Sequence, residues 1–152
     1  MTVAGMSAAV PVWSETEAEV STEENKRKAL EFLDASGRHD APQLAALMAE
    51  DGTYWVQGVP RLFRPAGEKS KAQICRYMES PSIFKGSFKQ TIGHVTAEND
   101  RVAVEVMVQA STADGRGYEN TYHYLFVFKD GLIRQVKEYL DTAVAAEMFN
   151  QT

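Results

Sequence analysis

The sequence has little of several features that mark particular classes of protein. Its 152 residues include one cysteine, Cys75, so no intramolecular disulfide can form and the chain fits a reducing cytoplasm. No stretch approaches the roughly 20 apolar residues that span a bilayer. Glu15, Glu17 and Glu19 interrupt the first 20 residues, which lack the basic start of a signal peptide. We therefore expect a cytoplasmic protein without a membrane segment.

Positive charge is also scarce. The chain has 16 Lys and Arg residues against 21 Asp and Glu residues, for a net charge of −5. Nucleic-acid-binding proteins normally present a basic face, so this balance argues against a nucleic-acid partner. The sequence contains no Gly-rich phosphate loop, no paired-cysteine motif and no His-x-x-x-His spacing. We therefore expect no metal, nucleotide or flavin cofactor.

What is present is the composition of one ordinary globular domain. Hydrophobic residues make up 44% of the chain and charged residues 24%. A chain of this length can bury a sizeable core without disulfides or metal. Residues 1–20 read as an N-terminal tail, in which Trp13 either docks on the body or is disordered. The pattern predicts a single domain over residues 21–150.

Helical signals fill the first half of that domain. Each predicted helix begins at a polar residue that can accept a hydrogen bond from the first-turn amides. A short strand at residues 54–56 and a loop at residues 58–69 separate the second helix from the third. The predicted helices run from Ser21 to Gly37, from Asp40 to Asp51, and from Ser70 to the residue before Pro81.

After Pro81 the apolar period changes from helical to two, which predicts strands. The breaks between these strands carry hairpin residues, and Asp130-Gly131 is the sharpest of them. A last short helix is expected from Ala143 to Phe149. Three helices followed by an antiparallel meander indicate an α+β fold. The predicted strands cover residues 85–96, 101–112, 117–129 and 132–140.

A carboxylate interrupts an apolar row on the last predicted strand. Val136 and Leu140 flank Glu138 on one strand face, because strand side chains alternate. If that row lines a cavity, desolvation raises the pKa of the acid and makes it a candidate for proton transfer. The alternative is that Glu138 faces solvent or an arginine across the sheet.

From Ser21 to Phe149 the chain resembles the SnoaL-like and nuclear-transport-factor-two-like families. The resemblance rests on the order of helices and meander, and on Asp130-Gly131-Leu132-Ile133 followed by Lys137-Glu138-Tyr139-Leu140-Asp141-Thr142. It implies a cone-shaped barrel, in which a curved antiparallel sheet wraps on three N-terminal helices with a pocket between. It also implies a homodimer packed through the sheet.

Two subfamilies imply an acid/base role for Glu138. Limonene epoxide hydrolase places its water-activating aspartate just before the aromatic residue of a similar last-strand motif, where Glu138 precedes Tyr139. The phenazine-biosynthesis proteins place a catalytic glutamate at the same position and are also similar over Tyr118-Glu119-Asn120. The hydrolase's Arg-x-Asp pair and asparagine are missing from Glu105-Val106-Met107 and Tyr54-Trp55-Val56, which argues against epoxide opening by its arrangement.

Ketosteroid isomerase looks similar in fold but differs at the reacting groups. Its general base falls at Val56, which cannot take a proton. Its oxyanion-donating acid falls near Tyr124, whose phenol can still donate a hydrogen bond to a developing oxyanion. Isomerisation by the same base is therefore excluded, whereas oxyanion stabilisation is not.

The family geometry also turns Glu105 toward the pocket. Two close carboxylates cannot both ionise cheaply, so their pKa values separate into one proton donor and one acceptor. The expected catalytic residues are Glu138, Glu105 and Tyr124. The alternative is a buried hydrogen-bond network that merely satisfies these groups. The expected substrate-binding residues are Tyr54, Val56, Met107, Gln109, Asn120, Tyr122, Val136 and His94.

The first functional hypothesis is a cofactor-independent acid/base enzyme of the cyclase, dehydratase, isomerase or hydrolase type. Its substrate would be a small, mostly apolar, oxygenated molecule. Two alternatives stay open, a non-catalytic protein that binds a small apolar ligand and a protein-interaction module of the same fold. Exchange of Glu138 for glutamine separates the first two, and a solid interior without a cavity would favour the third.

Overall fold

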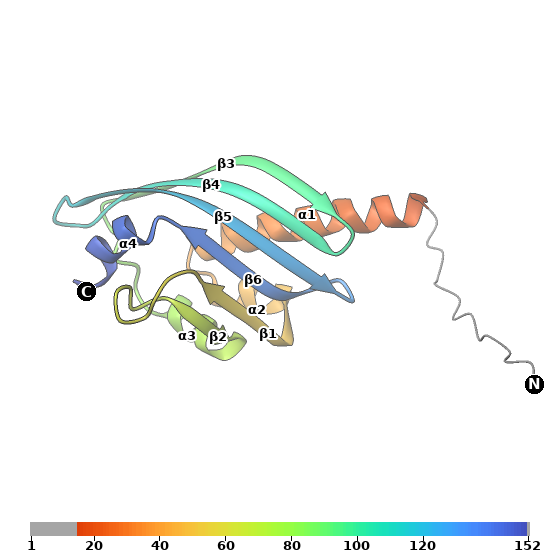
Figure 1. The fold of residues 1–152 in the computed structure, drawn as a ribbon, viewed down its shortest axis with the longest axis horizontal. Helices are drawn as coiled ribbons and strands as arrows, with labels where there is room; N and C mark the ends of the chain where they lie inside the picture. The colour runs from red at the N-terminus through yellow and green to blue at the C-terminus, as the bar shows by residue number, and fades with distance from the viewer. Residues whose placement is uncertain (1–14, 152) are drawn as a thin grey trace, which may run out of the picture.

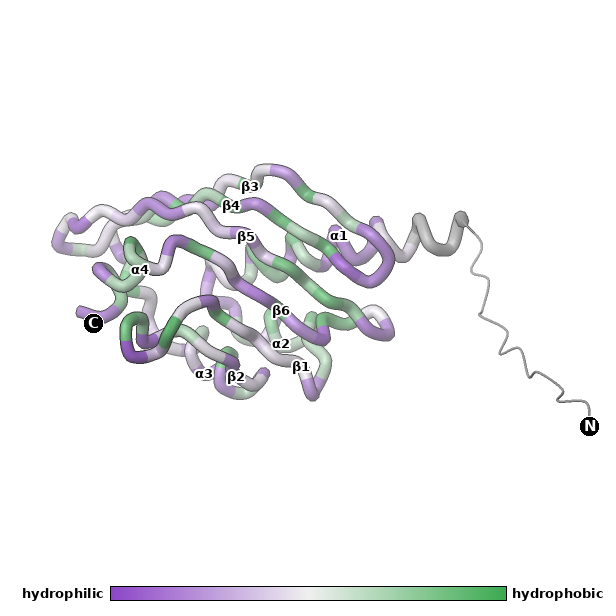
Figure 2. The backbone as a smooth tube through the Cα atoms, viewed as in Figure 1, coloured by the Kyte–Doolittle hydropathy of each residue, from purple (hydrophilic) through white to green (hydrophobic). Residues whose placement is uncertain are grey.

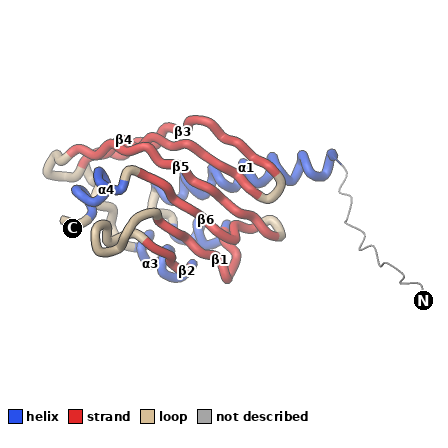
Figure 3. The backbone as a smooth tube through the Cα atoms, in the orientation of Figure 1, coloured by secondary structure: helices blue, strands red, loops and turns tan. Residues whose placement is uncertain are grey.

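The structure is a computed structural model that describes residues 15–151, with side chains from residue 21 onward. Within that range the chain forms four helices and one six-stranded sheet (Figures 1 and 3). No helix within the range is long and apolar enough to cross a membrane. In chain order the elements are α1 (Glu15–Gly37), α2 (Ala41–Leu47), β1 (Met48–Val56), β2 (Gly67–Ser70), α3 (Lys71–Glu79), β3 (Ser87–Glu98), β4 (Arg101–Ser111), β5 (Gly117–Lys129), β6 (Leu132–Leu140) and α4 (Thr142–Phe149).

The sheet is mixed and open. Its strand order is β2-β1-β6-β5-β4-β3, so β2 and β3 are its edges. All neighbouring strands are antiparallel except β1 and β6, which run parallel. The predicted meander of β3 to β6 is confirmed. The fully antiparallel sheet is wrong, because β1 comes from the N-terminal half and adds beside the last strand in the same direction.

The two faces of the sheet differ sharply in polarity. Along β4 the residues alternate between buried valines and more exposed side chains. Figure 2 shows where apolar and polar residues lie along the strands. We call the face with Val102, Val104, Val106 and Val108 the inner face and the opposite one the outer face. The inner face packs against α1, where Phe32 is fully buried and meets Phe126 edge to face at 5.5 Å. Burial of such aromatic side chains is the main stabilising contribution of this core.

Local signals fix several element ends as predicted. Ser70 accepts a hydrogen bond from the Gln73 amide while the Gln73 side chain accepts from the Ser70 amide, which is a complete capping box for α3. Asp141 caps α4 by accepting hydrogen bonds from the amides of Ala143 and Val144. The Asp130-Gly131 turn has φ angles of 53° and 76°, as a two-residue hairpin with a right-handed strand twist requires.

Other ends differ from the prediction. Helix α1 begins at Glu15, inside the predicted tail, so the motif at Ser21 does not start it; residues 1–14, with Trp13, lie outside the described residues. Helix α2 ends at Leu47 rather than at Asp51, because β1 already starts at Met48. Most of the short edge strand β2 falls within the predicted loop at residues 58–69. The strand has only four residues, which are too few to show the alternation of apolar and polar side chains that identifies a strand.

Candidate active site

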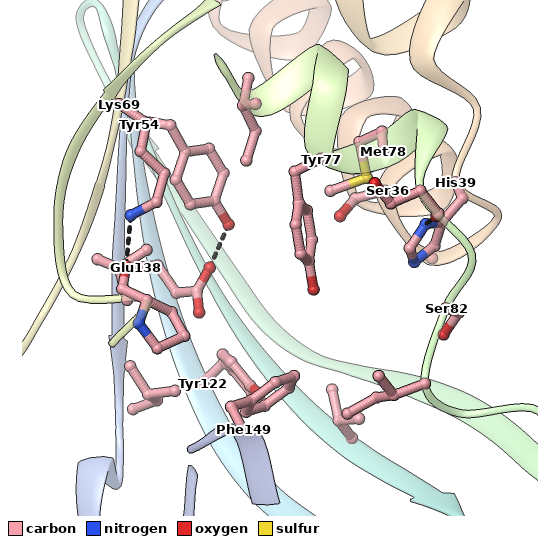
Figure 4. A pocket seen from close by; sticks show the side chains of 18 of the residues that line it. Ser36, His39, Tyr54, Lys69, Tyr77, Met78, Ser82, Tyr122, Glu138 and Phe149 are labelled. Carbon is pink, nitrogen blue, oxygen red and sulfur yellow. Dashed lines mark hydrogen bonds between the residues drawn. The ribbon is translucent and has the colours of Figure 1, made fainter. Parts of the chain in front are cut away.

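A cavity of about 680 Å³ lies between the inner face of the sheet and helices α1 and α3. Its size falls within the range of pockets that hold small organic molecules. Much of its wall is aromatic, and Figure 4 shows the side chains that converge on it from the sheet and from α3. The aromatic lining includes Tyr54, Tyr77, Phe84, Phe88, Tyr122 and Phe149.

Strand register carries Glu138 into this cavity. In a sheet, residues directly opposite each other share a face. Glu138 of β6 lies opposite Tyr124 of β5 and Val56 of β1, and Tyr124 lies opposite the buried Val104 of β4. The apolar row of β4 must face the helices, so the whole row, Glu138 included, faces them too.

The Glu138 carboxyl group is held in an environment that favours its protonated form. Tyr54 donates its hydroxyl hydrogen bond to one carboxylate oxygen, as Figure 4 shows. Among the side chains of residues 21–151 this is the hydrogen bond that the carboxylate accepts, and Figure 4 shows its other oxygen pointing into the cavity. Burial raises the pKa of Glu138 to about 7, against the opposing effects of the Tyr54 hydrogen bond and the Lys69 charge. This carboxyl can therefore both give and take a proton near neutral pH.

Phenols surround the carboxyl group. Burial, followed by the negative charge of Glu138, raises the pKa values of Tyr54, Tyr122 and Tyr124 well above the ordinary value. These side chains therefore stay protonated and act as hydrogen-bond donors. Tyr122 and Tyr124 stack in parallel, with ring centroids 5.7 Å apart. The site thus combines one titrating acid, which can transfer a proton, with fixed O–H donors, which can stabilise a developing oxyanion.

A hydrogen-bond chain ties this wall to α4. The Tyr122 hydroxyl lies 2.6 Å from that of Tyr118, which accepts from Asn120 at 3.0 Å. The Asn120 amide also donates to the Asp141 carbonyl and accepts from the Asp141 N–H, at 3.0 and 3.2 Å. Asn120 therefore fixes the corner between β6 and α4.

Lys69 is a cavity residue that the sequence analysis missed. It lies on β2 directly opposite Tyr54, and its ammonium donates to the carbonyls of Pro65 and Gly67. Burial lowers the pKa of Lys69 and the charge of Glu138 opposes this effect. Tyr77 of α3 also projects into the cavity.

The structure brings together five of the predicted site residues. Two more are fully or nearly fully buried beside the site without lining the cavity, namely Asn120 and Val136. The five that line the cavity are Tyr54, Val56, Tyr122, Tyr124 and Glu138.

Four predicted site residues lie elsewhere, and for these the expected facing is wrong. Glu105, Met107 and Gln109 alternate with the buried valines of β4 and so lie on the outer face. His94 sits where the β3–β4 register shifts, and its Nδ1 lies 3.0 Å from a Glu105 oxygen on that same face. The second acid of the predicted pair therefore does not share a chamber with Glu138.

Residues that could hold a cofactor are few. Within residues 15–151 no group of three or more His, Cys, Asp or Glu side chains is arranged to hold a metal ion. The charged groups on the cavity wall are those of Glu138, Lys69, Arg64 and Arg76, and the imidazole of His39 lies across the cavity from Glu138 and Lys69 (Figure 4).

Comparison with known proteins identifies the family. Residues 29–136, most of the chain, match the sequence profile of the SnoaL-like domain. The chain belongs to the SnoaL-like family. The family resemblance found in the sequence is therefore confirmed. A comparison with curated protein sequences finds no significant match.

Solved structures similar to this SnoaL-like chain share its fold. Bal32a from a soil-derived mobile gene cassette is 24% identical with a TM-score of 0.69, and the alignment covers 85% of this chain and 98% of Bal32a. TerC co-crystallized with polyporic acid is 16% identical with a TM-score of 0.71, covering 84% and 98%. An LEH-like epoxide hydrolase from M. tuberculosis is 17% identical with a TM-score of 0.65, covering 86% and 92%. The cone-shaped α+β fold is thus shown.

Proposed function

We propose that this protein is a cofactor-independent enzyme that moves protons on a small, mostly apolar, oxygenated molecule. The observation that carries the proposal is the Glu138 carboxyl group, which is open to a cavity of about 680 Å³ and has a pKa of about 7. A carboxyl group with a pKa near the working pH is an effective general acid and base. Similarity to an LEH-like epoxide hydrolase and to TerC, crystallized with polyporic acid, supports a small-molecule substrate.

The geometry suits proton abstraction next to a carbonyl group. The Glu138 carboxylate takes a proton from the carbon, and the electron pair of that C–H bond moves to the carbonyl oxygen to give an enolate. A phenol from Tyr122 or Tyr124 donates a hydrogen bond to this oxygen, while the Tyr54 hydroxyl holds the Glu138 carboxylate. Protonated Glu138 then returns the proton to another carbon, or gives it to a hydroxyl group that leaves as water. These two outcomes are isomerisation and dehydration. In cyclisation the enolate carbon forms a bond to a second carbonyl carbon of the same molecule, the π electrons of that carbonyl move to its oxygen, and protonated Glu138 gives its proton to that oxygen.

Two other functions remain as alternatives. The cavity disfavours an interaction module, which would be expected to have a solid interior. A binding protein that does not turn over its ligand would use the same cavity, and the consequence of changing Glu138 separates it from an enzyme. A homodimer and a cytoplasmic location stay predictions, of which sedimentation velocity decides the first.

The test compares wild type with Glu138→Gln and with Glu105→Gln. A thermal-shift screen of terpenoids, steroids, aromatic polyketides, epoxides and polyporic acid finds ligands, and liquid chromatography of each hit measures its consumption. Glu138→Gln should keep ligand binding and lose about 100- to 10,000-fold in turnover, because the cavity shape remains and the titrating group is gone. Glu105→Gln is the matched control on the outer face and should keep full turnover.

The outcomes divide the hypotheses. Full turnover by Glu138→Gln would contradict the proposed role of that residue. Ligands that stabilise both proteins and are consumed by neither would identify a binding protein. Loss of turnover in Glu105→Gln alone would return the predicted second acid to the mechanism.

A further inference from the structure

The charge of the cavity wall is opposite to that of the whole chain. The chain carries 21 acidic and 16 basic residues. The ionised wall residues are Lys69, Arg64 and Arg76 on the positive side and Glu138 on the negative side. With a pKa of about 7, Glu138 is only partly ionised at neutral pH. The cavity therefore has a positive field, which concentrates negatively charged small molecules.

Lys69 is the basic group next to Glu138. Strand β2 places it opposite Tyr54, whose hydroxyl binds Glu138, and Figure 4 shows all three side chains on one wall. Its ammonium donates to the backbone carbonyls of Pro65 and Gly67. These acceptors favour the charged ammonium over the neutral amine. Lys69 is thus held as a fixed cation at the reacting end of the cavity.

That cation lacks a partner of opposite charge at contact distance. Among the side chains of residues 21–151 no carboxylate lies within ion-pair distance of Lys69. Lys71, two residues further along, pairs with Glu50 at 2.9 Å. A partly buried ammonium with carbonyl acceptors alone has lost part of its hydration without gaining a counter-ion. An anionic oxygen that enters the cavity would supply the counter-ion.

We propose that Lys69 is the anion-binding residue of the cavity, and that the substrate is a mostly apolar molecule bearing a carboxylate or another ionised oxygen. The proposal rests on the proposed function only in taking the cavity as the substrate site. An anion paired with Lys69 lies beside Glu138 and Tyr54, so Lys69 selects the substrate and orients it at the acid. The rest of the cavity wall, which is largely aromatic, contacts the apolar part of the substrate.

Binding of such an anion should change the protonation of Glu138. The charged and titratable groups around Glu138 are Lys69 and the phenols of Tyr54, Tyr77, Tyr122 and Tyr124. The Lys69 charge lowers the pKa of Glu138, so its neutralisation by an anion raises that pKa. At pH 7 Glu138 then binds its proton more completely, and the complex takes up protons from the buffer.

The experiment uses 2-naphthoate and its neutral isostere 2-naphthamide as probes. Calorimetry at pH 7 measures both dissociation constants for wild type, Lys69→Met and Lys89→Met. Wild type should bind the carboxylate at least tenfold more tightly than the amide, with proton uptake that shows as a dependence of the heat on buffer ionisation. Lys69→Met should lose the preference and the uptake while its amide affinity stays within about threefold. Lys89→Met removes a lysine from the outer face and should behave as wild type.

Two results would overturn the proposal. One is a wild type that binds the two probes equally or binds neither, and the other is a Lys69→Met that keeps the carboxylate preference. Lys69→Arg retains the charge and should restore the preference, which separates loss of charge from loss of folding. Glu138→Gln should keep the preference for the carboxylate. The binding experiment therefore tests Lys69 independently of whether Glu138 acts in turnover.

Discussion

Glu138 and Glu105 are the same side chain on β6 and β4, the two strands that flank β5 in the sheet, and they occupy opposite faces. Glu138 lies on the inner face, where burial raises its pKa to about 7. Glu105 lies on the outer face, where the hydrogen bond with His94 lowers its pKa. The chemistry of each acid therefore depends on the face it occupies rather than on its strand. A single step of register in β4 would turn Glu105 to the inner face and the valines of that strand to the outer face.

The largest expected difference between the faces concerns stability. Phe126 is fully buried on the inner face against Phe32, and Phe126→Ala should lower the free energy of unfolding by about 3 to 5 kcal/mol. Thr121, on the same strand but on the outer face, is exposed, and Thr121→Ala should cost less than about 1 kcal/mol. Urea denaturation measures both. Equal losses would mean that the outer face is also packed.

The second difference is the pH dependence of stability. The pKa of Glu138 in the folded protein lies above its ordinary value of 4.5, so the native state holds this proton more tightly than the unfolded state does. This contribution is fully present below pH 4.5 and is lost as the pH rises to about 7, with a change of at most about 3 kcal/mol. Glu138→Gln should remove that slope, whereas Glu105→Gln should not. Unfolding curves at half-unit pH steps measure it, and identical slopes in wild type and Glu138→Gln would contradict the burial of the acid.

A smaller effect concerns the pH profile of turnover. The hydrogen bond from Tyr54 lowers the pKa of Glu138, so Tyr54→Phe should move the acidic limb of kcat/KM upward by about one pH unit. Tyr139→Phe is the matched control, because Tyr139 lies on the outer side of β6 and packs edge to face on Trp55 at 5.3 Å. An unmoved limb in Tyr54→Phe would mean that another group sets it.

The smallest effect belongs to the outer pair. The side chains of His94 and Glu105 are 91% and 54% exposed, so solvent screens their interaction. His94→Ala should change Tm by less than about 2 °C and return the Glu105 pKa toward its ordinary value. Thermal unfolding and carboxyl NMR measure these two changes. A large loss of stability would show that the pair is part of a buried contact.

The sequence predicts the parts of this comparison that local chemistry determines. The capping box at Ser70 and the turn at Asp130-Gly131 are complete within a few residues, and both are confirmed. Glu138 is found because apolar residues flank it on its strand face and because the resemblance to two subfamilies implies an acid at this position. Glu105 is misplaced because the facing of β4 is taken from the family geometry rather than from its valine row. That row is decisive once the register places Val104 opposite Tyr124.

Other parts of the site depend on contacts between distant segments. Lys69 comes from a four-residue edge strand that pairs with β1, and nothing in a Pro- and Gly-rich stretch reveals that pairing. His94 lies at a register shift of β3, where the alternation of faces breaks. The parallel pairing of β1 with β6 likewise depends on the whole fold. The sequence therefore predicts the acid of the site, and the structure supplies its neighbours.

The most direct test of this account is a carboxyl carbon NMR titration of the protein labelled at its glutamate side chains. The signal of Glu138 is assigned by its loss in Glu138→Gln, and that of Glu105 by its loss in Glu105→Gln. The account predicts that Glu138 titrates with a pKa of about 7 and that Glu105 titrates below 4.5. A Glu138 pKa near 4.5 would contradict it, because the acid would then be exposed to water and have no special capacity for proton transfer at neutral pH.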